Sequence, residues 1–269
     1  MKTMCEFFGI SRAAYYAWLK RLEKLDQDIF RMTLIQEAWE RSWKTYGYRR
    51  ITLWIRQHKG IVINHKAVLR LMNKLDIQSV ARKRKPYRKV HELGTYHRYE
   101  NLLDRNFTAE KSNQKWVTDI TYINTKQGWA YLATIKDLFD GYIVAHKLSR
   151  QPTHKLVTDT LTLAKLKEKV TDGILLHSDQ GQQYTSHKYF VLTKEYEITP
   201  SMSRKGNCWD NAPMENFFGH LKEEALRQYK LLSFENTMEL IDQYIYFYNY
   251  ERIQLKTRQT PYQTRCLSM

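Results

Sequence analysis

The strongest constraint on the fold is a run in which apolar and polar residues alternate. Residues 117–123, Val-Thr-Asp-Ile-Thr-Tyr-Ile, carry this pattern, which predicts a half-buried β-strand. Two more strands are predicted at 129–138 and 142–148, and the pair Asp140-Gly141 between them is typical of a hairpin turn. Further on, the patterns predict helices at 153–169 and 186–196 and short strands at 173–178 and 198–202. Three strands followed by alternating helices and strands indicate an α/β domain.

The segment from Ser201 to Lys222 predicts a strand end, a basic glycine turn and then a helix. Asp210 or Asn211 can cap this helix, and Pro213 suits its first turn.

Glu215 and Lys222 lie seven positions apart on this predicted helix, so they share one face. Two helical turns separate them by about 10 Å. A carboxylate and a lysine would therefore face outward beside a basic turn, which indicates a surface that meets a metal ion and DNA.

Residues 1–80 are predicted to be helical and to contain a helix-turn-helix unit. One amphipathic helix is predicted at 48–58, Gly60 ends it, and Asn64 can cap a second helix that runs to Lys74. Two short helices around a glycine turn can place one helix in the major groove of DNA. The alternative is a helix pair that serves only for packing.

A basic linker is predicted at 81–112, and its most basic stretch is Arg82-Lys83-Arg84-Lys85. Such a segment can lie along DNA phosphates, and a solvated linker is the alternative. After the core, a long tyrosine-rich helix at 233–250 and an irregular basic tail are predicted.

The charge balance points to a polyanionic partner. The 269 residues carry a formal net charge of +16, which indicates nucleic acid, although a merely basic or ribosome-associated protein would look similar. No run approaches the roughly 18–20 apolar residues of a membrane span, and the N-terminus lacks the apolar core of a signal peptide. The three cysteines are far apart and include no C-x-x-C pair, so they imply no disulfide framework and argue against a zinc knuckle. We therefore expect a protein of the cytoplasm.

Three acidic residues occupy positions that suit metal chemistry. Asp119 lies within an apolar strand, Asp179 follows the strand at 173–178, and Glu215 lies in the first turn of the last core helix. A charge inside an apolar strand is costly unless it is paired or binds a cation, and α/β sheets place their sites at the carboxyl ends of strands. Carboxylates suit Mg²⁺ or Mn²⁺, and two such ions can support phosphodiester transfer. The alternative is a structural network of acids.

Other chemistries fit this chain less well. A tyrosine recombinase needs a His-x-x-Arg motif, and none of the nine histidines has an arginine three residues on. His177, Ser178 and Asp179 are adjacent on a predicted strand, so neighbouring side chains point to opposite faces and do not form a nucleophile–base pair. His177 is more typical of a hydrogen-bonded core residue, and Cys208 of a packing residue.

Several motifs resemble the bacterial insertion-sequence transposases that have a retroviral-integrase-type core. They are Trp116-Val-Thr-Asp-Ile-Thr, Leu176-His-Ser-Asp-Gln-Gly-Gln-Gln-Tyr184, the stretch from Ser203 to Lys222, and Tyr248-Asn-x-x-Arg252 with Thr260-Pro261. The 35 residues between Asp179 and Glu215 match the family's Asp, Asp-35-Glu signature. Residues 46–80 resemble the family's helix-turn-helix region, so the likeness covers nearly the whole chain.

The resemblance implies a ribonuclease-H-like integrase core, a mixed five-stranded sheet with flanking helices, at 113–228. Residues 1–80 would be the helix-turn-helix region, 81–112 the basic linker, and 229–269 a C-terminal helix and basic tail. Asp119, Asp179 and Glu215 would be both the catalytic and the metal-binding residues, with Mg²⁺ as cofactor and Mn²⁺ as a substitute. The reaction implied is cleavage at the ends of a mobile element, followed by strand transfer. DNA contacts are expected from the basic turn, the same helix and the linker, at Arg204, Lys205, Asn207, Lys222, Arg82, Lys83, Arg84 and Lys85.

The implied partners are double-stranded DNA, as terminal inverted repeats and as target, and further copies of this chain assembled on that DNA. The chain resembles a second-reading-frame product, so an upstream-frame subunit is a further expected partner, and a location at the bacterial nucleoid follows. Two alternatives stay open: a DNA-binding regulator or inhibitor of transposition that is inactive without its partner, and a nuclease that cuts but does not join strands.

Overall fold

The computed structural model describes residues 2–22, 27–79, 97–169 and 173–267. The chain divides into two compact units, Met1–Ser79 and Val80–Met269. None of the described helices is long and apolar enough to cross a membrane.

The first unit is helical, as its sequence predicts. Its five helices are α1 (Lys2–Phe7), α2 (Arg12–Leu22), α3 (Gln27–Arg41), α4 (Tyr48–Lys59) and α5 (His65–Lys74). Gly60 ends α4 in the left-handed conformation (φ 67°), and the Asn64 side chain accepts a hydrogen bond from the Lys66 N–H to begin α5. Ile51, Ile55 and Leu71 are fully buried, because the apolar stripes of α4 and α5 face each other and α3. The predicted helix pair around a glycine turn is therefore present.

The second unit contains a mixed five-stranded sheet. Its strands are β1 (Lys115–Thr125), β2 (Gly128–Asp137), β3 (Ile143–Ser149), β4 (Leu175–Ser178) and β5 (Thr199–Met202), in the order β3-β2-β1-β4-β5. β1, β2 and β3 form an antiparallel meander, whereas β4 pairs in parallel with β1 and β5 in parallel with β4. The parallel pairs need crossovers, and helices supply them. The α/β fold with a mixed five-stranded sheet is confirmed.

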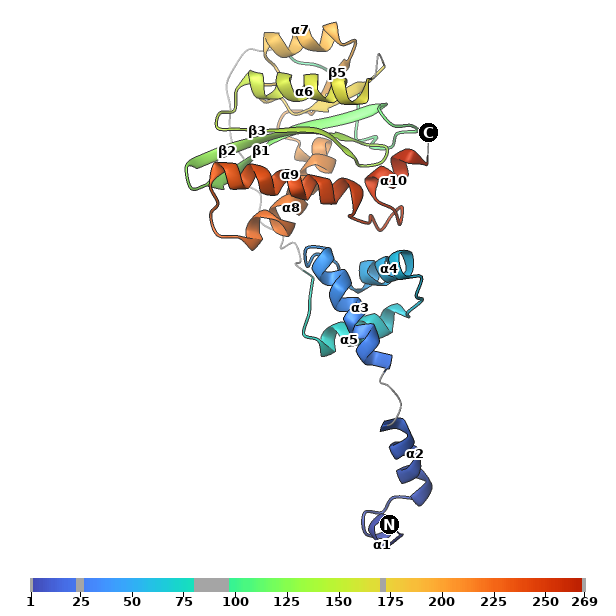
Figure 1. Cartoon of the computed structure of the whole chain (residues 1–269). Helices are drawn as coiled ribbons and strands as arrows, with labels where there is room; N and C mark the ends of the chain where they lie inside the picture. The colour runs from blue at the N-terminus through green and yellow to red at the C-terminus, as the bar shows by residue number, and fades with distance from the viewer. Residues whose placement is uncertain (1, 23–26, 80–96, 170–172, 268–269) are drawn as a thin grey trace. The chain divides into compact units, whose positions relative to one another are not determined.

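Helices cover both faces of this sheet (Figure 1). On one face, α6 (His154–Glu168) and α7 (His187–Glu195) enclose an apolar core that includes Trp116, Leu161 and Tyr189. On the other face lie α8 (Ala212–Glu224) and α9 (Phe234–Tyr250), which are joined where the Phe217 and Tyr248 rings meet edge to face. The sheet is thus a central layer between two helical layers.

The start of α8 differs from the sequence prediction in its capping. A short 3₁₀ turn, η1 (Cys208–Asn211), precedes α8, and no side chain caps the helix. Asp210 accepts hydrogen bonds from two arginines, whereas Asn211 donates its amide to the Thr118 carbonyl and its buried Oδ1 makes no hydrogen bond among the described residues, so neither side chain caps the helix. Pro213 lies in the first turn, as expected.

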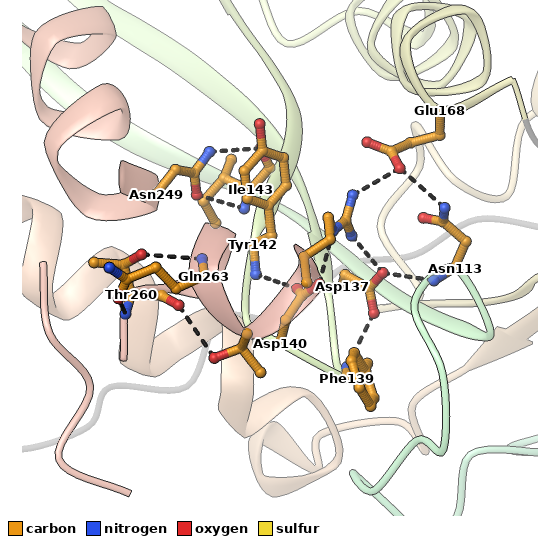
Figure 2. A network of polar contacts seen from close by, with 12 residues as sticks. Asn113, Asp137, Phe139, Asp140, Tyr142, Ile143, Glu168, Asn249, Thr260 and Gln263 are labelled. Atoms are coloured by element: carbon orange, nitrogen blue, oxygen red, sulfur yellow. Dashed lines mark hydrogen bonds and ion pairs between the residues drawn. The ribbon is translucent and has the colours of Figure 1, made fainter. Parts of the chain in front are cut away.

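The C-terminal segment is fastened to the hairpin between β2 and β3 by buried charges (Figure 2). Arg265, on α10 (Pro261–Cys266), pairs with Asp137 at 2.6 Å, with Asp140 at 2.7 Å and with Glu168 at 2.6 Å. Thr260 and Gln263 form a reciprocal capping box that begins α10. The Gln254 side chain donates to the Asp140 carbonyl at 3.0 Å.

Contacts also join the predicted linker and tail to the core. Leu103 is buried, and the Ser201 hydroxyl accepts the backbone N–H groups of Leu102 and Leu103. Asn249 of α9 bonds both backbone groups of Ile143. Residues 97–108 and 234–266 therefore pack on the sheet domain, and residues 80–96 lie outside the described residues.

Candidate active site

Parallel pairing of β1 and β4 brings two of the predicted acids side by side. Val117 on β1 pairs with His177 on β4, so Asp119 lies two residues beyond this pair on β1, and Asp179 follows directly after the end of β4. Neighbouring strands are about 4.8 Å apart. Asp119 is half-buried within β1, whereas Asp179 is exposed just beyond the carboxyl end of β4.

The third acid comes from α8, whose start is tied to the same strand. The Asn211 side chain donates to the Thr118 carbonyl at 3.1 Å, one residue before Asp119. Glu215 follows on the first turn of α8, where it is exposed, and Lys222 lies half-buried two turns later. The hydrogen bond thus places the start of α8 next to the carboxylate of β1.

The electrostatics of Asp119 show that these groups share one region. Burial raises the pKa of Asp119 well above its ordinary value, and the charges of Asp179 and Glu215 raise it further. The Ile120 N–H and the Lys222 ammonium act in the opposite direction and lower this pKa. Three carboxylates and one lysine, drawn from three elements, are therefore within electrostatic reach of one another.

Backbone N–H groups orient the two aspartates. The Ile120 N–H donates to Asp119 Oδ1 at 2.7 Å, and the Gly181 N–H donates to Asp179 Oδ1 at 3.0 Å. A Cβ atom at Gly181 would lie 3.0 Å from Asp179 Oδ1, so glycine permits this close approach.

Buried neutral groups lie behind the acids. The Thr118 hydroxyl donates to the Thr134 carbonyl and lies 3.1 Å from the Tyr184 hydroxyl. Burial raises the pKa of Tyr184 well above its ordinary value, and the Asp119 charge adds to this, so Tyr184 stays a neutral phenol.

His177 is a core residue, as its sequence context indicates. Its Nδ1 lies 2.9 Å from Ser201 Oγ and its Nε2 lies 3.0 Å from Ser203 Oγ, both on the β5 side. Burial lowers the pKa of His177 to about 4, so the ring is neutral at physiological pH.

The basic turn before α8 is built around Asp210, whose role the sequence pattern did not reveal. Asp210 is fully buried, and its carboxylate accepts from Arg105 at 2.7 Å and from the Arg204 Nε and Nη2 atoms at 3.0 Å. Hydrogen bonds from Arg204, and then from Arg105, hold the pKa of Asp210 well below its usual range, although burial opposes them. Arg105 also donates to Asn207, so the turn is held by ion pairs and hydrogen bonds. Arg105 lies about 100 residues away in sequence, and no local motif marks it.

The predicted DNA-contact residues have different environments. Lys205 is exposed on the turn, Arg204 is partly exposed although it pairs with Asp210, and Asn207 is half-buried. The predicted contacts Arg82, Lys83, Arg84 and Lys85 lie outside the described residues, as does the side chain of Cys208. Across residues 2–22, 27–79, 97–169 and 173–267, no group of three or more His, Cys, Asp or Glu side chains is arranged to hold a metal ion.

Comparison with known proteins decides the family. Residues 109–208 and 215–268 match two models of the integrase core domain, and residues 24–85 match an HTH-like domain. The chain is 41% identical over 253 residues to the putative transposase InsK for insertion sequence element IS150 of Escherichia coli, covering 93% of this chain and 87% of that protein. The chain belongs to the insertion-sequence transposases.

Two further relatives agree with this assignment. The transposase InsF for insertion sequence IS3A of Escherichia coli is 34% identical over 252 residues, covering 91% of this chain and 86% of that protein. The insertion element IS600 uncharacterized 31 kDa protein of Shigella sonnei is 37% identical over 253 residues, covering 93% of this chain and 92% of that protein.

The fold of this transposase is also similar to solved structures. One is a chain from the cryoEM structure of the simian T-cell lymphotropic virus intasome in complex with PP2A regulatory subunit B56 gamma, with a TM-score of 0.50 and 17% identity, covering 80% of this chain and 74% of that chain. The family, the integrase-type fold and the transposase function expected from the sequence motifs are therefore confirmed. An integrase core is typical of polynucleotidyl transferases, so the transposase acts by phosphodiester transfer on DNA.

Proposed function

We propose that this transposase uses Asp119, Asp179 and Glu215 to bind divalent metal ions that support cleavage and joining at the ends of an insertion sequence. The observation that carries the proposal is the shared location of the three acids. Asp119 lies on β1, Asp179 follows the end of the adjacent parallel strand β4, and the charges of Asp179 and Glu215 both act on Asp119.

The chemistry of the three side chains, though not their arrangement among the described residues, suits Mg²⁺, with Mn²⁺ as a substitute. All three side chains offer carboxylate oxygens, which are the hard ligands that these ions prefer. Burial, and after it the charges of Asp179 and Glu215, raise the pKa of Asp119, and a bound cation would offset the repulsion between these charges. When bound, the ions supply Lewis-acid activation of the attacking hydroxyl or water and stabilise the leaving oxygen.

The chain's own residues orient and hold the reactants. The N–H groups of Ile120 and Gly181 fix one oxygen of each aspartate. Lys222, on the same helix as Glu215, is placed to hold a phosphate beside the acids, since its charge reaches Asp119. We further propose that Lys205, with Arg204 and Asn207, contacts DNA from the turn that Asp210 anchors.

The decisive experiment substitutes each acid while keeping its shape. Asp119→Asn, Asp179→Asn and Glu215→Gln should each abolish Mn²⁺-dependent strand cleavage, a loss of at least 100-fold, and leave DNA binding in a gel shift within about 3-fold. Glu195→Gln, at an exposed acid on α7, is the matched control and should cleave normally.

Thermal unfolding supplies a readout that does not depend on activity. Mn²⁺ should raise the Tm of the unaltered chain and of Glu195→Gln, because a ligand that binds only the folded state stabilises it. The Tm of Asp119→Asn should not respond. Cleavage at the normal rate by Asp119→Asn would disprove the assignment of the acids.

The proposed partners are the terminal inverted repeats, target DNA and further copies of this chain, because joining two ends requires both ends in one assembly. An upstream-frame subunit is also proposed. Incubating the purified chain with element-end DNA and Mn²⁺ tests this: cleavage with joining shows that the chain acts alone, cleavage without joining indicates a nuclease, and binding without cleavage indicates dependence on the partner.

A further inference from the structure

A groove of about 390 Å³ opens beside α8, between the end of β1 and the segment that follows α8. Its lining includes Tyr122 of β1, Lys222 of α8 and Thr237 of α9, together with Arg227, Tyr229 and Lys230 from the segment after α8. This segment begins with the 3₁₀ turn η2 (Leu226–Gln228).

The charge of this groove suits a phosphate. Among the described residues that line it, Lys222, Arg227 and Lys230 are basic and none is acidic. Arg227 pairs with Glu223, which balances part of its charge, while Lys230 is exposed.

The aromatic side chains of the groove suit a nucleobase. Tyr122 and Tyr229 are 56% and 52% exposed, although tyrosine rings usually bury much of their surface. The Tyr122 ring meets the Tyr131 ring edge to face at 5.2 Å between centroids, which holds Tyr122 in place. Basic side chains interleaved with exposed aromatic rings are the composition of surfaces that bind unpaired nucleic acid.

The walls are already held in position. The Lys126 N–H donates to the Leu232 carbonyl at 2.8 Å, and the Phe234 N–H donates to Gln127 Oε1 at 2.9 Å. These bonds tie the turn between β1 and β2 to the segment that carries Tyr229. A preformed groove loses little conformational entropy when a ligand binds.

The groove begins next to the proposed active site. Lys222 lines the groove, and its charge also reaches Asp119. A DNA strand whose phosphate lies at the acids can therefore continue into the groove without leaving the surface of the second unit.

We propose that this groove binds one or two unpaired nucleotides of the DNA strand next to the phosphate that is cut. A volume of 390 Å³ lies at the small end of ligand sites, which span about 300–1,000 Å³. Bases in a duplex are stacked on one another, so only an unpaired base can offer its face to Tyr229. The inference rests on the proposed function for the location of the cut, but the binding itself needs no cleavage.

The test uses the full chain and two probes, a fluorescein-labelled ten-nucleotide oligo-dT and a blunt 20-base-pair duplex, with Kd measured by anisotropy. Tyr229→Ala should weaken oligo-dT binding by about 5- to 160-fold, since stacking on an aromatic side chain is worth about 1–3 kcal/mol per base. Tyr229→Phe keeps the ring and should bind within about 2-fold of the unaltered chain. Duplex binding should change little in either variant.

Two controls separate this groove from other DNA-binding surfaces. Tyr246→Ala removes an equally exposed ring (59%) on α9 and should leave oligo-dT binding unchanged. An oligo-dT that carries 5-iododeoxyuridine should crosslink on irradiation to the peptide that contains Tyr229, in the unaltered chain and in Asp119→Asn alike.

The outcomes are distinct for the two proposals. Crosslinking to a peptide that does not contain Tyr229, or unchanged oligo-dT binding by Tyr229→Ala, would overturn the proposal that this groove binds unpaired nucleotides. An equal loss for oligo-dT and duplex in Tyr229→Ala would overturn the unpaired-base assignment, because it would indicate a surface for the duplex backbone. If Asp119→Asn still cleaves DNA, the metal-site proposal fails, while the binding and crosslinking results for the groove stand on their own.

Discussion

At the scale of single residues, neighbours in sequence take opposite roles in this transposase. His177 and Asp179 are two residues apart, yet His177 is fully buried between two serines and Asp179 is exposed at the strand end. The difference arises because β4 ends at Ser178, so the chain leaves the sheet before it reaches the aspartate.

His177 predicts a measurable pH dependence of stability. Its pKa is lowered to about 4 in the folded chain, against about 6.5 for an unfolded histidine, so the unfolded state binds the extra proton first. The stability associated with the neutral ring is therefore lost as pH falls from about 6.5 to 4, at about 1.4 kcal/mol per pH unit.

Urea unfolding of the unaltered chain and of His177→Gln at pH 7 and pH 5 checks this. Between pH 7 and pH 5, the free energy of unfolding of the unaltered chain should fall by about 2 kcal/mol more than that of His177→Gln. This difference follows from the lower pKa of His177 in the folded state. An equal loss in both proteins would show that His177 is not the group responsible.

At the scale of elements, α8 is fixed at both ends. Asn211 ties its start to β1, and Glu224 ties its end to Tyr244 of α9 at 2.8 Å and to Arg252, just after α9, at 2.6 Å. Glu215 and Lys222 lie between these two anchors, so the position of both depends on them.

The anchor at Glu224 predicts a large loss of stability when one partner is removed. Burial by itself would raise the pKa of Glu224. Hydrogen bonds from His220 and Arg252 outweigh this effect and lower the pKa of Glu224 to about 2. Glu224→Gln leaves the Arg252 guanidinium buried without a carboxylate, which should cost about 3–5 kcal/mol in the free energy of unfolding.

Chemical denaturation of Glu224→Gln, Arg252→Met and the double variant measures this coupling. The free energy of unfolding of the double variant should fall by less than the sum of the decreases in the two single variants, because the double variant leaves no buried unpaired charge. The folded pKa of Glu224 is below its unfolded value, so its contribution is present above about pH 4.5 and disappears as pH falls toward 2. Additive losses would indicate that the pair is not coupled.

At the scale of the whole molecule, the chain consists of two compact units with separate cores. The first unit has its own buried residues, including Ile35 and Leu71, and the second has the sheet and its two helical layers. The second unit also contains residues 97–108 and α10, which are distant in sequence and pack against the sheet domain.

The second unit is expected to fold when it is produced alone as residues 97–269. It should unfold in one cooperative thermal transition and retain Mn²⁺-dependent stabilisation, since all three acids belong to it. Circular dichroism and a thermal melt with and without Mn²⁺ measure both properties.

Removing residues 261–269 from this fragment should lower its Tm sharply, because Asp137, Asp140 and Glu168 would then be buried without Arg265. A fragment 97–269 that does not fold would contradict the expected independence of the second unit. An unchanged Tm after the truncation would contradict the stabilising role of Arg265.

Local sequence patterns are enough to predict the elements, and with the family motifs they name three candidate acids. Alternating residues at 117–123, helical periodicity around Glu215 and the glycine at position 60 are local signals, because each reflects the backbone geometry of its own segment. These signals, with the family motifs, predict the α/β class, the helical first unit and the three carboxylates.

Only the tertiary structure decided which distant residues meet. The register of β1 on β4 sets Asp119 beside Asp179, Arg105 reaches Asp210 across the fold, and Arg252 reaches Glu224. No periodicity marks such contacts, since they depend on strand order and on how helices pack, which are properties of the whole chain. The groove beside α8 is of the same kind, because its walls come from two segments that become neighbours only in the folded molecule.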